Sequence, residues 1–113
     1  MIIYKVLNIK TGFLYIGQTL RDLKIRKAEH HRSAANILKT NPTIFHLALR
    51  QFGTASFEWT ILEICNSLEH LNEREKFYIK ELNTVHPLGY NQTTGGHMDE
   101  TMSEEVRDRI SEL

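Results

Sequence analysis

The chain has 113 residues, of which 41% are hydrophobic and 25% are charged, and its formal net charge is zero at pH 7. This composition is typical of one ordinary globular domain. Its single cysteine, Cys65, excludes internal disulfides and cysteine-rich zinc sites. The sequence has neither an apolar stretch of membrane-spanning length nor a signal peptide, so we expect an intracellular protein that does not bind membranes.

The balanced overall charge is divided into two halves of opposite sign. Residues 1–50 contain nine Lys and Arg against two Asp and Glu, whereas residues 51–113 contain five against twelve. A basic segment is typical of proteins that bind polyanions such as nucleic acids. It is equally compatible with an exposed basic helix face, and the acidic second half argues against strong non-specific binding to DNA.

The first two elements are predicted to form a β-hairpin. Residues 2–9 and 13–19 are rich in Ile, Val, Tyr, Phe and Thr, and turn-forming residues at 8–12 separate them. The first strand carries apolar residues on both faces, which suits a central strand covered on both sides.

The length of the hairpin loop decides where two tyrosines point. With an even loop, Tyr4 lies opposite Gly17 and Tyr15 lies opposite Val6, so that both tyrosines project from one face. An odd loop would place them on opposite faces. Gly17 itself weakens a strand and often marks the close approach of a ligand or of another backbone.

Helices are expected next. One begins after a cap at Thr19 or Asp22 and runs to about Leu38, and a second covers 43–52 and ends at Gly53. On the first helix, Arg26 and His30 share a face, which either lines a cleft or forms a solvated rim.

The second half of the chain is predicted as a strand, a helix and an irregular segment. Residues 57–65 alternate as a strand, with Phe57, Trp59 and Ile61 on one face and Glu63 as a further candidate for that face. Residues 68–82 form the next helix and 83–97 are irregular. A capping box over 101–104 precedes a short terminal helix.

A carboxylate interrupts the apolar face of the helix at 68–82. Glu75 lies four residues from both Leu71 and Ile79, so it faces the same way as they do. A carboxylate turned toward a core is costly unless it is paired or bound to a metal. An ion pair with Arg26 and ligation of a metal ion both remain open at this point.

Together these residues resemble the GIY-YIG nuclease family. Ile2-Ile3-Tyr4 is similar to the first signature with its Gly replaced, and Tyr15-Ile16-Gly17 matches the second. The further matches are Arg26 and His30 in R-K-A-E-H, the segment L-A-L-R-Q-F-G at 47–53, Glu75 in N-E-R-E-K-F-Y-I and Asn91 in G-Y-N. The motifs extend over residues 2–96 in the order and spacing of the family.

The resemblance implies an α/β (α+β) fold with a three-stranded antiparallel sheet flanked by helices. It also implies a DNA endonuclease that hydrolyses phosphodiester bonds with one Mg²⁺ (or Mn²⁺) ion. The implied catalytic set is Tyr4 as general base, Tyr15 holding water or phosphate, Arg26 gripping phosphate, His30 assisting proton transfer, Glu75 as metal ligand and Asn91 as a structural or phosphate-positioning group.

This chemistry agrees with the residue types. Mg²⁺ is commonly held by one or two carboxylates plus substrate phosphate, so Glu75 alone is enough for a one-metal site. An unperturbed tyrosine has a pKa of about 10, so Tyr4 needs nearby positive charge, from Arg26, His30 or Lys5, to act as a base.

The remaining assignments concern DNA contacts and residues without a catalytic role. The expected DNA-binding residues are Lys5, Gly17, Arg26, Lys27 and His46. The other histidines (His31, His70, His86 and His97) are expected at the surface, and Trp59 in the core.

Residues 1–96 are therefore predicted to form the catalytic domain, and 97–113 a tail helix. The tail resembles the junction in phage and intron homing endonucleases, where it would link to a separate DNA-recognition region. Alternatively, the chain is a complete small protein whose last helix packs on the domain. The expected partners are double-stranded DNA and a divalent metal, with a monomer favoured. The competing function is a non-catalytic nucleic-acid-binding or interaction module on the same scaffold.

Overall fold

The structure, a computed structural model, describes residues 1–38 and 41–96. The predicted terminal helix, and His97 with it, lie outside these residues. Within them, no helix is both long and apolar enough to cross a membrane.

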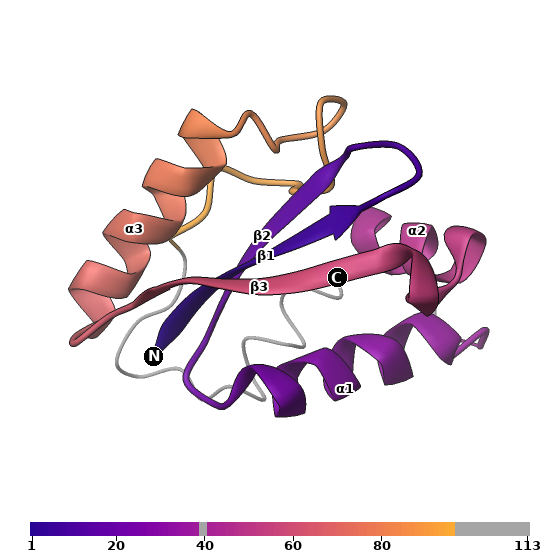
Figure 1. The fold of residues 1–113 in the computed structure, drawn as a ribbon, viewed down its shortest axis with the longest axis horizontal. Helices are drawn as coiled ribbons and strands as arrows, with labels where there is room; N and C mark the ends of the chain where they lie inside the picture. Colours follow the sequence, from indigo (N-terminus) through magenta and orange to yellow (C-terminus); the bar gives the residue numbers. More distant parts are fainter. Residues whose placement is uncertain (39–40, 97–113) are drawn as a thin grey trace.

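The chain forms a three-stranded antiparallel sheet with helices on both faces, which confirms the predicted fold class (Figure 1). The strand order is β2-β1-β3, so the strand with two apolar faces is the central one, as expected. The elements are β1 (Ile2–Asn8), β2 (Leu14–Thr19), α1 (Leu23–Ala35), α2 (Ile44–Phe52), a 3-10 turn η1 (Thr54–Ser56), β3 (Phe57–Ile64) and α3 (Leu68–Glu81).

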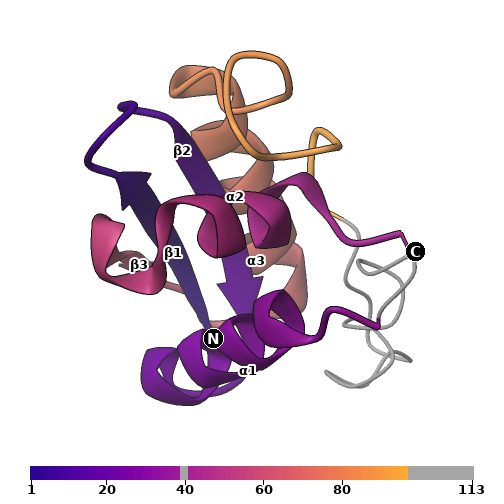
Figure 2. The ribbon, with the colours of Figure 1, turned by 90° about the vertical axis from the view of Figure 1, so that its right-hand side faces the viewer.

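The sheet separates two apolar clusters. Figure 2 shows α1 and α2 in front of the strands and α3 behind them. The buried cluster under α1 and α2 consists of Tyr4, Val6, Ala34, Phe45, Ala48, Leu49, Phe57 and Tyr90. The cluster under α3 consists of Ile3, Ile16, Cys65, Leu71 and Ile79. Alternation along the strands assigns neighbouring residues to opposite clusters.

The hairpin has the even register. The Asn8 N–H donates to the Phe13 carbonyl at 3.0 Å, which leaves a four-residue loop, 9–12. Tyr4 pairs with Gly17 and Val6 with Tyr15. Both tyrosines therefore lie on the face covered by α1 and α2.

Glycine is the only residue type that fits at position 17, opposite Tyr4. A Cβ atom at position 17 would overlap Cζ and the hydroxyl oxygen of Tyr4, and Cε2 would lie only 2.8 Å away. The tyrosine ring therefore occupies the space of a side chain on the neighbouring strand. The packing of Tyr4 therefore explains why residue 17 is a glycine.

A β-bulge in β3 changes which face Glu63 occupies. Tyr4 pairs with Ile61, but Ile3 pairs with Glu63, so Leu62 is an extra residue in β3. Beyond the bulge the alternation is shifted by one residue. The expectation that Glu63 shares a face with Phe57 and Trp59 is therefore wrong, because Glu63 faces α3.

Side chains and backbone turns set the helix ends. Asp22 is the N-cap of α1, and the Thr43 hydroxyl accepts the His46 N–H at the start of α2. Helix α1 ends at Ala35 rather than near Leu38. The Arg50 side chain of α2 donates to the Ala34 carbonyl at 2.9 Å and to the carbonyl of the C-cap residue at 3.3 Å. Carbonyls left open by the early end of the helix are thereby satisfied.

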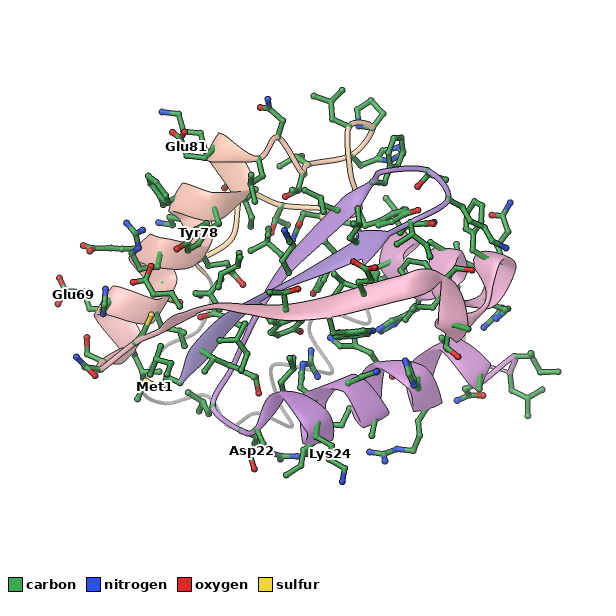
Figure 3. All side chains as sticks on the ribbon, in the orientation of Figure 1. Met1, Asp22, Lys24, Glu69, Tyr78 and Glu81 are labelled. Carbon is green, nitrogen blue, oxygen red and sulfur yellow. The ribbon has the colours of Figure 1, made fainter. Side chains whose placement is uncertain are left out.

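Polar groups connect α3 to the end of β3. Oε1 of Glu63 accepts from Arg74 Nε at 2.8 Å and from the Tyr78 hydroxyl at 2.9 Å, and its Oε2 lies 3.2 Å from His70 Nε2. Figure 3 shows Tyr78 on the side of α3 toward the sheet, whereas Glu69 points away. Burial alone would raise the pKa of Glu63, but the two hydrogen bonds and the charges of Arg74 and His70 lower it.

Replacing Gly17 with Ala should destabilise the fold by about 1 to 3 kcal/mol, because the new methyl group overpacks the Tyr4 ring. Urea unfolding measures the loss. In a Tyr4→Ala background the ring is gone, and the same substitution should cost little. An equal cost in both backgrounds would contradict the packing explanation.

Replacing Glu63 with Gln should cost stability most above pH 4.5. The carboxyl has a lowered pKa in the folded chain, so its pairing stabilises fully above its ordinary value of 4.5 and is lost as the pH falls through the lower folded value. The free energies of unfolding of the wild type and Glu63→Gln should therefore converge in acid. Glu58→Gln, an exposed change on β3, is the control, and a constant difference at every pH would refute the prediction.

Candidate active site

Three polar side chains form a hydrogen-bonded chain under α1 and α2. The buried Tyr4 hydroxyl on β1 lies 2.7 Å from Nε2 of His30 on α1. Nδ1 of His30 in turn lies 2.8 Å from Nε2 of His46 on α2. All three side chains are at most 5% exposed. Three elements thus supply one buried path along which a proton can move.

Aromatic rings hold this chain in place. Tyr15 is stacked on Phe45 with the ring centroids 4.1 Å apart and the planes within 3°. Trp59 is stacked beside Tyr4 at 6.0 Å, and His30 packs edge-on against Phe45 at 5.0 Å. The rings fix the orientation of the hydroxyl and imidazole groups among them.

Sequence reasoning missed two of these roles. It placed Trp59 in the core, but this residue is only partly buried and lies against Tyr4. It did not single out Phe45, which is buried on α2, whereas Leu47 of the same helix is exposed. Phe45 lies four residues before Leu49 and seven before Phe52, which places the three on one helix face. This spacing was the signal available in the sequence.

Glu75 is buried on the sheet-facing side of α3, as its position predicts. It is 4% exposed, and its Oε1 accepts from the Gly96 N–H at 2.7 Å and from Gln18 Nε2 at 3.2 Å. The Gln18 amide nitrogen also donates to Asn72 Oδ1 at 3.2 Å. Gln18 therefore links β2 to the helix that carries the carboxylate. Its position two residues after Ile16, on the α3 face, was a signal that the sequence analysis did not use.

The groups around Glu75 are those that a hard divalent cation prefers. With its amide nitrogen donating to two acceptors, Gln18 presents a buried Oε1 that has no hydrogen-bond partner in the part of the chain that the structure describes. Carboxylate and amide oxygens are typical ligands of Mg²⁺ and Mn²⁺. Within 1–38 and 41–96, no group of three His, Cys, Asp or Glu includes Glu75. The donor set therefore fits one hard ion held by a single carboxylate.

The edge strand β2 lies between these two parts of the site. Tyr15 and Gly17 of β2 face α1 and α2 with Tyr4, whereas Ile16 and Gln18 face α3. The side chain of Glu75 thus meets β2 from the opposite side to the tyrosines. Any group that contacts both parts must lie along this strand.

Asn91 binds the outer edge of β2. Its Oδ1 accepts from the Ile16 N–H at 2.9 Å, and its Nδ2 donates to the Ile16 carbonyl at 2.8 Å. Thr84 donates to the same Oδ1 at 2.7 Å. The amide therefore replaces a neighbouring strand at an edge that would otherwise leave backbone groups unpaired. A catalytic role of Asn91 remains a prediction.

The predicted DNA-binding residues do not form one group. Arg26 is buried on α1, with Nη1 3.7 Å from Oε1 of Glu29, and Lys27 lies over the Trp59 ring at 5.8 Å. His46 is buried against His30. Lys5, next to Tyr4 in sequence, points to the opposite face of the sheet. It therefore does not supply positive charge to Tyr4, because successive strand residues alternate between faces.

Lys27 and His31 of α1 both lie near Trp59, but only Lys27 brings a positive charge there. His31 packs edge-on against this ring at 5.8 Å. Burial lowers the pKa of His31, and the positive charge of Lys27 lowers it further. His86, by contrast, is exposed, as predicted.

Comparison with known proteins gives a consistent result. Residues 1–91 match the sequence model of the GIY-YIG catalytic domain. The structure is similar to that of the catalytic domain of the homing endonuclease I-TevI, with 28% identity over 80% of this chain and 96% of that one and a TM-score of 0.64. A mutant of the catalytic domain of the intron endonuclease I-TevI gives 26% identity over 82% and 93% of the two chains, with a TM-score of 0.70. Curated protein sequences gave no match.

Replacing Asn91 with Ala should lower the free energy of unfolding by about 1 to 3 kcal/mol, because the buried backbone groups of Ile16 lose their partners. Thr84→Val, which removes only one bond to this amide, is the matched control and should cost less. Chemical denaturation checks both variants. A neutral Asn91→Ala would show that the amide does not secure the strand edge.

Proposed function

Because this chain belongs to the GIY-YIG family and is an endonuclease, we propose that it cleaves double-stranded DNA by hydrolysis with one divalent ion, Mg²⁺ or Mn²⁺. The observation that carries the proposal is the buried chain from Tyr4 through His30 to His46. A domain that only binds DNA has no need of a buried proton path.

Tyr4 acts as the general base for the attacking water. As its hydroxyl oxygen takes a proton from water, it gives its own proton to Nε2 of His30, 2.7 Å away. Nδ1 of His30 donates to Nε2 of His46, which keeps Nε2 of His30 as the acceptor. His46 is therefore a positioning residue for His30 in this mechanism, rather than a DNA contact.

Two further residues hold the reacting groups. Tyr15 is locked by its stack on Phe45, so its hydroxyl orients water or phosphate at little entropic cost. Arg26 grips a phosphate oxygen through its guanidinium group. Lys27 adds charge on the same helix.

Glu75 would hold the metal ion, together with Oε1 of Gln18. When bound, Mg²⁺ neutralises charge on the phosphoryl group. Gln18 and the Gly96 N–H keep the carboxylate of Glu75 oriented toward that position. The scissile phosphate accordingly lies along β2, where it reaches both the tyrosines and Glu75.

The wider assignment follows the relatives. Residues 1–96 act as the catalytic domain, working as a monomer, and 97–113 lead to DNA-recognition elements, as in a homing endonuclease. The similarity to the catalytic domains of I-TevI supports the assignment of residues 1–96 as the catalytic domain.

Cleavage of supercoiled plasmid by an excess of protein tests the proposal. Nicking should require Mg²⁺ or Mn²⁺ and disappear with EDTA. Glu75→Gln should abolish it, and Tyr4→Phe should slow it by about 10²- to 10⁴-fold, the range of a lost general base. Tyr78→Phe, on α3 at the β3 side, is the control and should cleave normally.

Circular dichroism confirms that each variant is folded. Metal-independent nicking, or folded Glu75→Gln that cleaves at the wild-type rate, would refute the proposed mechanism. Binding of DNA without any cleavage under these conditions would favour the non-catalytic module.

A further inference from the structure

A second set of metal-binding side chains lies where β3 leads into α3. Glu63, Cys65 and His70 each present one ligand atom, and these atoms all lie within 4.8 Å of one another. Oε2 of Glu63 and Nε2 of His70 are already 3.2 Å apart. We propose that these three residues form a site for a thiophilic divalent cation of the Zn²⁺ class.

The local fold holds the three ligands in place. The β-bulge at Leu62 turns Glu63 toward α3. Cys65 is buried, and its N–H donates to the Met1 carbonyl at 2.8 Å. The backbone N–H of His70 donates to the Ser67 N-cap in the first turn of α3. The strand end, the connecting turn and the helix start thus each supply one ligand.

The ligand types select the ion. Thiolate and imidazole ligands favour Zn²⁺ and related ions over Mg²⁺, which prefers oxygen ligands. In a tetrahedral site, Zn²⁺ is about 2.0 to 2.3 Å from each ligand atom. The ligand atoms must therefore lie nearly in van der Waals contact with one another. The Glu63–His70 pair meets this requirement as it stands, and the Cys65 thiol lies within 4.8 Å of both ligand atoms. Water completes the fourth position.

Outer contacts prepare Glu63 for this role. Arg74 and Tyr78 both bind Oε1, which leaves Oε2 directed at His70 and at the ion position. Hydrogen bonds of this kind orient ligating carboxylates in metal sites. Arg74 is held in turn over the Phe77 ring at 4.2 Å.

This site is separate from the one at Glu75. Glu63 belongs to β3 and Gln18 to β2, the two outer strands of the sheet. Two strand spacings, about 10 Å, lie between them. Figure 3 places Met1, whose carbonyl binds Cys65, at the end of the sheet nearest the start of α3. An ion there would join β3 to the helix that carries Glu75, so its expected effect is on stability.

Cobalt titration tests the proposal directly. With a phosphine reductant, Co²⁺ should give a thiolate-to-cobalt charge-transfer band together with the visible bands of a tetrahedral ion, and the charge-transfer band should saturate at one ion per chain. Cys65→Ser should lose the charge-transfer band. His70→Gln, at a half-exposed position that tolerates the change, should weaken binding at least about tenfold, because even outer-shell partners are worth about 10- to 100-fold.

Two controls and a stability measurement complete the test. His86→Gln removes an exposed histidine elsewhere, and Glu75→Ala removes the proposed Mg²⁺ ligand. Both should give the charge-transfer band with the wild-type affinity. Zn²⁺ should raise the Tm of the wild type and not that of His70→Gln. No charge-transfer band, an unchanged affinity in His70→Gln, or one ion per two chains would overturn the proposal.

Discussion

The fold depends on one close contact, in which the ring of Tyr4 crosses the backbone of Gly17 on the neighbouring strand. The ring fills space that would belong to another side chain, so its hydroxyl has one position, beside His30. Burying these polar groups is costly unless each finds a partner. His30 and His46 meet this need together, and in doing so they fix how α1 and α2 lie on the sheet.

The edge strand β2 connects this buried chain with the carboxylate on α3. Its alternate residues contribute to both sides, with Tyr15 turned toward Phe45 and Gln18 turned toward Glu75. A free strand edge would leave backbone groups unpaired, and the amide of Asn91 supplies partners for one residue of it. We propose that substrate phosphate lies along this strand, since only there can one group reach both sides.

The sequence alone predicted the elements of the described residues, because apolar alternation and turn residues are local signals, and the resemblance to a nuclease family implied the fold class. The hairpin register stayed open between an even and an odd loop until the structure showed a four-residue loop. The sequence did not predict the bulge at Leu62, since no residue type marks an extra strand residue, and so it placed Glu63 on the wrong face. The sequence also did not predict the contacts between helices. The partnership of His46 with His30, and the role of Phe45 against Tyr15, depend on how α1 and α2 cross the sheet.

The central claim is that Tyr4 and His30 act as one unit in proton transfer. A double-mutant cycle of plasmid cleavage under single-turnover conditions, with Tyr4→Phe, His30→Gln and the double variant, tests it most directly. If the two residues form one path, the double variant should be no slower than the slower single variant, because either change already breaks the path. Rate losses that multiply in the double variant would mean that the residues act independently, and would contradict the account.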